Sequence, residues 1–151
     1  EEEVTLFLDP TDSRSNGYFF RVYGSGLYLD GMLLDDGNNW DWSWERVWYA
    51  ATKMYDDRFE AEIRIPFKSI RYRPDAPEWG VNFERMIAAT QERLVWQHVP
   101  EGEGGMRVSN AGRLAGIEPQ TTVAEMAEDL PLLDAVGLAA ALADADAVLS
   151  L

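Results

Sequence analysis

Hydrophobic residues in the first part of the chain occur in short runs that predict β-strands. Residues 4–8, "VTLFL", join β-branched and aromatic side chains and end at the turn-rich "DPTDSRSNG", which predicts a buried strand. Residues 18–24 and 26–34 are two further apolar runs that meet around Gly24-Ser25-Gly26. This spacing predicts an antiparallel hairpin.

Strict alternation is clearest in "FEAEIRI", residues 59–65, where apolar and charged side chains take turns. Such a strand has one buried face and one wet face. Residues 48–55 precede it across a short connection that contains "DD". After it, Pro66 ends the strand, "FKSI" predicts a short helical turn, and residues 79–87 and 94–99 predict two more strands.

The hydrophobic period changes after Pro119. Thr122 and Glu125 have the spacing of a capping box, the following apolar residues recur at helical spacing, and Pro131 suits the first turn of a second helix. We therefore expect two regions, residues 1–118 and residues 119–151. The predicted fold is mainly β and antiparallel, followed by a short helical segment.

The net charge of the chain narrows the classes of ligand and partner that the protein can bind. The 27 acidic residues outnumber the 13 basic ones, for a formal net charge of −14, and residues 118–151 contain seven acidic residues without any Lys or Arg. Such a surface disfavours nucleic acid and anionic membranes. No apolar run reaches the about 18 residues of a membrane-spanning helix, and no signal peptide opens the chain. A neutral polar ligand fits this composition better.

Motifs of catalysis are missing from the sequence. The chain has no cysteine and one histidine, His98, so zinc sites of the thiolate and paired-histidine types are excluded. The glycines in "EGEGG" do not form a phosphate-binding loop. A glycosidase needs only two carboxylates, which 27 acidic residues supply by chance. We expect a protein that is not an enzyme, with a hydrolase as the remaining catalytic alternative.

The stretch "DDGNNWDWSWERVW", residues 35–48, places four of the six tryptophans among acidic and amide side chains. If the stretch is extended, Trp40, Trp42 and Trp44 share one face, and Trp48 continues it. Buried tryptophans are usually structural, and Trp48 opens a strand. Exposed indoles beside carboxylates and amides are instead typical of sugar binding. The polar residues available for that role are Asp36, Asn38, Asn39 and Asp41.

The same oxygens offer an alternative chemistry. Calcium takes six to eight oxygen ligands, and Asp35, Asp36, Asn38 and Asp41 could supply several of them. The order of these residues does not match an EF-hand loop, so a solvated acidic loop is the competing interpretation.

Several blocks in order resemble one family. The segments "EVTLFLDPTDSRSNGYFFRVYGSGLYLDGML", "DDGNNWDWSWERVWYAAT", "FEAEIRIPFKSIRY", "WGVNFERMI" and "RVSNAGRLAGIE" are similar to domains of the carbohydrate-binding module family 9-like group. The resemblance covers residues 2–118 and is strongest to the subgroup at the N-terminus of large bacterial outer-membrane proteins, ahead of a predicted β-barrel.

This resemblance implies an antiparallel β-sandwich of jelly-roll type, here with an incomplete set of strands. It also implies a non-catalytic module that binds oligosaccharide or polysaccharide, with structural calcium in some members and an exported location: periplasm, outer membrane or extracellular space. In the family two tryptophans clamp a terminal sugar. The best matches here are Trp42 and Trp96, with Trp40 and Trp79 next.

Two departures from the family define the alternative function. The family carries further strands ahead of the block that begins at Glu1, so we expect an exposed sheet edge that allows self-association. Residues 119–151 do not match the family, and we expect their helices to cover the open sheet; the competing interpretation is a flexible linker to another domain. The alternative is therefore a structural or protein-interaction β-sandwich that has lost sugar binding.

Overall fold

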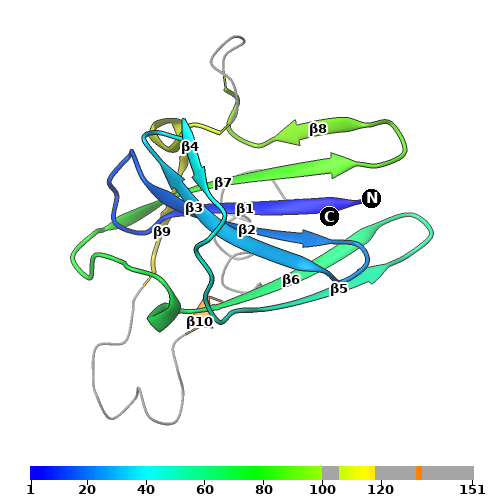
Figure 1. Ribbon diagram of the computed structural model, residues 1–151, viewed down its shortest axis with the longest axis horizontal. Helices are drawn as coiled ribbons and strands as arrows, with labels where there is room; N and C mark the ends of the chain where they lie inside the picture. Colours follow the sequence, from blue (N-terminus) through cyan, green and yellow to red (C-terminus); the bar gives the residue numbers. More distant parts are fainter. Residues whose placement is uncertain (100–105, 118–131, 134–151) are drawn as a thin grey trace.

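The computed structural model describes residues 1–99 and 106–117, and the backbone of residues 132–133. Its strands form two antiparallel sheets (Figure 1), which confirms the predicted β-sandwich class. The strands are β1 (Glu3–Asp9), β2 (Gly17–Tyr23), β3 (Tyr28–Leu34), β4 (Asn39–Asp41), β5 (Tyr49–Met54), β6 (Phe59–Pro66), β7 (Glu78–Ile87), β8 (Glu92–Val95), β9 (Gly112–Ala115) and β10 (Leu132–Leu133). Two short 3-10 helices are η1 (Phe67–Ser69) and η2 (Val108–Asn110).

The larger sheet has seven strands in the order β4-β3-β2-β1-β7-β8, with β9 also paired to β7. β7 is long enough to pair with β9 through its first half and with β8 through its second half, while β1 occupies its other edge. β1 therefore lies at the centre of the sheet and is buried along its whole length. This position explains why its sequence is nearly continuous in apolar residues.

The smaller sheet has the order β10-β6-β5. As its alternation predicted, β6 buries Phe59, Ile63 and Ile65 and exposes its charged residues. The predicted helical turn after Pro66 is η1. Strand β8 ends at Val95, so the prediction of a strand through residue 99 was too long, and the short strands β4 and β9 were not predicted.

The helices predicted after Pro119 lie outside the described residues, with one exception. Residues Leu132–Leu133, expected to be helical, are extended and pair with Ile65 and Pro66 of β6. The physical reason is that β6 pairs with β5 on one side only, so its other edge offers backbone donors and acceptors to an extended segment.

The main core lies between the two sheets. The inner face of the seven-stranded sheet, defined as the face toward the smaller sheet, contributes alternate residues of β1, β2 and β7. Trp48, Trp79 and the apolar side of β6 complete this core. Trp48 is therefore structural, as the strand that it precedes predicted.

A second, smaller core lies on the outer face, which is the face of the seven-stranded sheet turned away from the smaller sheet. It joins Phe7, Phe19 and Leu33 of the sheet with Met106 and Val108 of the segment around η2. Trp40 packs against its border. Part of the outer face is thus covered by the chain itself, and the rest carries the site described next.

Candidate functional site

Two tryptophans form a rigid aromatic platform at the β4 side of the outer face. Trp40 and Trp42 stack with ring centroids 5.7 Å apart and planes inclined by 19°. The ring of Phe19 lies beneath both, at 5.0 Å from Trp40 and 4.8 Å from Trp42. The Trp40 Nε1 donates a hydrogen bond to the Gly37 carbonyl at 3.1 Å. Trp42 remains 55% exposed, so the platform presents an immobilised indole to solvent.

Strand register explains why these two rings share the outer face. Trp40 lies directly across from Leu33, and continuing the register places Gly31 across from Trp42. A β-carbon on Gly31 would lie 2.5 Å from the Phe19 ring. The glycine therefore leaves the space that the aromatic platform fills.

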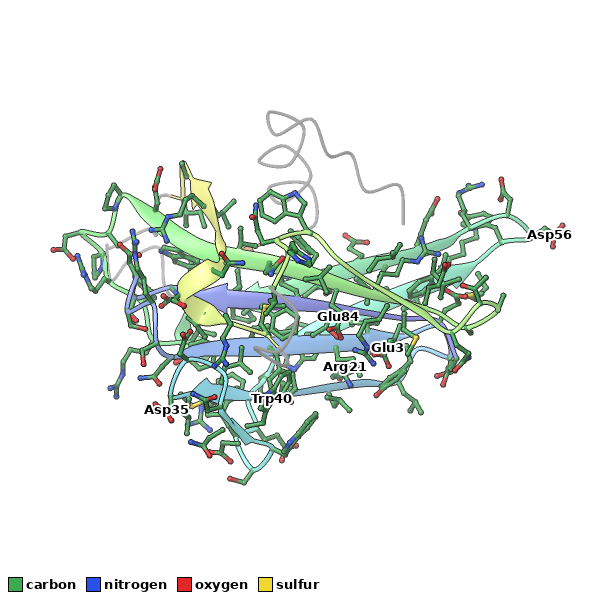
Figure 2. The ribbon with its side chains drawn as sticks, turned by 90° about the horizontal axis from the view of Figure 1, so that it is seen from above. Glu3, Arg21, Asp35, Trp40, Asp56 and Glu84 are labelled. Carbon is green, nitrogen blue, oxygen red and sulfur yellow. The ribbon has the colours of Figure 1, made fainter. Side chains whose placement is uncertain are left out.

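A cluster of charged side chains occupies the same face, toward β8. This outer-face ion cluster consists of Glu3, Arg21, Glu84 and Arg93, which come from four strands: β1, β2, β7 and β8. Figure 2 shows Glu3, Arg21 and Glu84 side by side over neighbouring strands, with Trp40 farther toward the β4 side. Register supports this arrangement, because Thr5 of β1 lies across from Arg21 on one side and from Glu84 on the other.

The ion pairs that Arg21 makes in this cluster are largely shielded from water. Arg21 Nε donates to Thr5 Oγ1 at 2.9 Å and lies 3.6 Å from Glu3 Oε1, while Arg21 Nη2 lies 3.8 Å from Glu84 Oε1. Arg93 pairs with Glu84 and lies 3.8 Å from Glu3. Arg93 is the most exposed member. The two positive and two negative charges cancel, so the cluster offers donors and acceptors without net charge.

Both acidic side chains of the cluster are largely removed from water. Burial raises the pKa of Glu84, although the charges of Arg93 and Arg21 oppose the shift. Glu3 Oε1 is buried and accepts no hydrogen bond. Its nearest donors are the guanidinium groups of Arg21 and Arg93, at 3.6 and 3.8 Å, so ion pairing rather than a hydrogen bond holds this oxygen.

The loop between β3 and β4 holds the acidic and amide residues that the sequence singled out, and much of it is engaged by protein. Asp36 accepts hydrogen bonds from the Ser109 backbone N–H at 2.8 Å and from its hydroxyl at 2.7 Å. Arg107 donates to Asn38 Oδ1 at 3.0 Å. Asp36 therefore anchors η2 over the outer-face core, and each of its carboxylate oxygens already accepts one hydrogen bond from Ser109.

Asp35, Asn39 and Asp41 lie around the same loop in different settings. Asp35 and Asn39 are exposed. The Asp41 carboxylate accepts from the Ser43 hydroxyl and backbone N–H, and the hydroxyl lowers its pKa. Among the described residues, no group of three or more His, Asp or Glu side chains is arranged to hold a metal ion. Calcium bound by Asp35, Asp36, Asn38 and Asp41 stays a prediction.

Trp96 and Trp79 do not join the platform. Trp96 packs against Phe83 with centroids 6.1 Å apart, on the inner side of the seven-stranded sheet. Trp79 is 1% exposed and lies in the main core. The reason is parity: Val95 pairs with Glu84 on the outer face, so the next residue points inward. The structure therefore does not bring Trp42 and Trp96 together as a clamp.

The four tryptophans of residues 40–48 also divide between the faces. Trp44 packs on Tyr18 at 4.7 Å and Trp48 on Phe20 at 5.0 Å, both toward the main core. The condition for one shared face, an extended stretch, is not met beyond Asp41, because a turn follows and the chain crosses to the other side of the sheet.

The outer-face ion cluster was not predicted from the sequence. A signal was present, since Glu3 at the start of β1, and Arg21 and Glu84 within their apolar strands, occupy the positions that alternate with core residues. This pattern indicates that β1, β2 and β7 each have one charged face. Their order in the seven-stranded sheet places these three faces next to one another.

A separate hollow of about 230 Å³ lies near the start of β2, lined by Pro10, Thr11, Asn16, Gly17, Tyr18, Met32 and Arg71. The Tyr18 hydroxyl there accepts a hydrogen bond from the Arg71 backbone N–H. The hollow presents no open indole plane, so we consider it a weaker candidate for a ligand than the outer face.

Comparisons with known proteins leave the assignment to physical argument. No family model, curated protein or solved structure matches the chain. Within the part of the chain that the structure describes, no helix is long and apolar enough to cross a membrane.

Proposed function

We propose that this protein is a non-catalytic carbohydrate-binding module whose ligand lies on the outer face, over Trp42 and Trp40. The observation that carries the proposal is the exposed indole of Trp42, which is stacked on Trp40 and fixed by Phe19. The C–H face of a pyranose packs on such a plane. Because protein contacts already immobilise the ring, stacking costs little side-chain entropy.

The charge distribution favours a neutral sugar over other ligands with flat faces. Nucleic-acid bases also stack on indoles, but their binding requires a basic groove. Here the net charge is −14 and the neighbouring cluster sums to zero. The resemblance to carbohydrate-binding domains favours the same ligand class, and it is also the basis for proposing an exported location.

The test is a titration of the purified chain with a panel of neutral oligosaccharides, followed by tryptophan fluorescence. We expect saturable binding in the millimolar to micromolar range, equivalent to about 4–8 kcal/mol. Trp42→Ala should weaken binding at least about tenfold. Tyr49→Ala is the matched control, because Tyr49 is similarly exposed, at 52%, and lies on β5 of the other sheet.

Two results would contradict the proposal. One is a well-folded protein that binds no member of a broad panel. The other is equal loss of binding in the Trp42 and Tyr49 variants. Release of product from a glycoside by the purified chain would instead favour the hydrolase alternative.

A second candidate function, protein interaction, has its own observation. Among the described residues, β5 pairs on its β6 side only. Val47 and Tyr49 near this edge are 61% and 52% exposed. Such an edge favours pairing with a second chain. Sedimentation velocity tests it: a concentration-dependent dimer that Val47→Glu dissociates would favour this function.

A further inference from the structure

The aromatic platform has one open side. Among the described residues, the only ring stacked on Trp42 is Trp40, and the second expected clamp residue, Trp96, lies on the other face of the sheet. A clamp or a blind pocket selects the end of a sugar chain because the chain cannot continue through it. An open sheet face places no such limit on either end.

The polar groups of the outer face extend away from the platform. Arg21 lies two strands away from Trp42 in the sheet and is displaced from it by two residues in the strand direction. The two Cα atoms are therefore about 10 Å apart across the sheet and about 7 Å apart along the strands. Arg93 is three strands farther, about another 14 Å. This distance exceeds the width of one sugar ring. A ligand that touches both ends of the face must contain several units.

The chemistry of the cluster suits the hydroxyl groups of a neutral chain. Arg93 carries a planar fork of N–H donors and is the most exposed member of the cluster. Adjacent sugar hydroxyls accept hydrogen bonds, so they complement this fork of donors. A cluster without net charge on an acidic protein gives no attraction for an anionic polysaccharide.

We infer that the outer face binds an internal stretch of a neutral polysaccharide, which runs from the Trp40–Trp42 platform across the outer-face ion cluster, and that it does not select the chain end. This inference rests on the proposed function and adds the ligand's length and the direction in which it lies.

The experiment is isothermal titration with xylo-, cello- and manno-oligosaccharides of one to six units, each with a free and with a borohydride-reduced end. We expect affinity to rise at least about tenfold between one and four units. Reduction of the end should leave the affinity of the six-unit sugar unchanged within about twofold.

Arg93→Gln separates the two parts of the ligand. It should weaken binding of the six-unit sugar about tenfold and leave binding of the one-unit sugar within about twofold of the unchanged protein. The variant should fold, because 45% of the Arg93 side chain is exposed. Arg64→Gln is the control, since Arg64 is an exposed arginine on β6 of the other sheet, and it should change neither affinity.

The outcomes distinguish this inference from the proposed function. Equal affinities for one-unit and six-unit sugars, or loss of binding on reduction of the end, would overturn the inference and leave sugar binding by Trp42 intact. An unchanged six-unit affinity in Arg93→Gln would also overturn it. No binding of any sugar by the folded protein would overturn both.

Discussion

At the scale of single residues, identical side chains have different roles according to the face on which they lie. Trp79 is enclosed by Phe67 and Tyr72 in the main core, whereas Trp42 contacts rings on one side and water on the other. Removal of a buried aromatic ring leaves a cavity as well as losing transfer free energy. The two tryptophans therefore differ in how much they contribute to the stability of the protein and in their function.

This difference is measurable by urea denaturation. Trp79→Ala should lower the free energy of unfolding by about 3–5 kcal/mol. Trp42→Ala should lower it by about 0.5–1.5 kcal/mol, the range of aromatic pair contacts. Similar losses in both variants would mean that Trp42 is a core residue in solution and would weaken the case for an open platform.

Glu84 gives the protein a pH dependence of defined sign. Burial raises its pKa above the ordinary 4.5, with Glu3 adding to the shift and Arg93 and Arg21 opposing it. Between 4.5 and the raised pKa, the folded state holds a proton that the unfolded state has lost. Its contribution to stability is therefore present below the unfolded pKa and is lost as pH rises through the folded pKa.

Glu84→Gln removes this titration. We expect the difference in unfolding free energy between the unchanged protein and the variant to fall as pH rises from about 4, and to level off above the folded pKa of Glu84. Urea denaturation of both proteins across this range measures the difference. A difference that stays constant with pH would show that Glu84 titrates normally.

At the scale of elements, the loop between β3 and β4 is fastened to η2 from two directions. Asp35, Asp36 and Gly37 all have positive φ, a conformation that Asp and Gly tolerate better than other residues. This bend presents the Asp36 carboxylate to Ser109 and brings Gly37 against the Met106 carbonyl. Met106 and Val108 are thereby held over the outer-face core.

Asp36→Ala should weaken the attachment of the β3–β4 loop to η2. Both hydrogen bonds to Ser109 are exposed, so the expected cost is about 1 kcal/mol, below the about 1.5–3 kcal/mol of bonds to a charged group because water screens them. Amide hydrogen exchange should increase at residues 106–110 and stay unchanged in β6. If addition of calcium raises the melting temperature of the unchanged protein and not of Asp36→Ala, this loop binds calcium after all.

At the scale of the whole molecule, the sandwich is uneven. Seven strands form one sheet and three form the other, so the smaller sheet covers only the inner face of the larger one. In Figure 2, Asp35 and Asp56 lie at opposite ends of the molecule, and Asp56 marks the protruding end of the β5–β6 hairpin. Edge strands and an open outer face are the consequence of this shape.

Deletion of residues 119–151 tests how one of these edges is protected. It removes β10 and leaves the backbone groups along one edge of β6 unpaired. We expect the shortened chain to associate at increasing concentration, because an unpaired edge recruits other strands. Size-exclusion chromatography with light scattering measures this. A monomer of unchanged stability would show that β10 contributes nothing to solubility.

The sequence by itself determined the strands of the main core. Apolar runs in β1, β2 and β3, the strict alternation of β6 and the glycine-containing turn between β2 and β3 are local patterns, and each strand formed where its pattern predicted it. The reason is that strand periodicity and turn chemistry depend on neighbours in the chain. The short strands β4 and β9 carry too few residues for such a pattern.

Only the tertiary structure decided which residues form the site. Trp40 and Trp42 share a face, while Trp44 and Trp96 lie on the other, because one turn and the register of β8 set their parity. The outer-face ion cluster exists because the strand order places β2, β1, β7 and β8 side by side. Sequence spacing fixes the alternation within a strand, but the pairing of distant strands determines which alternating faces meet.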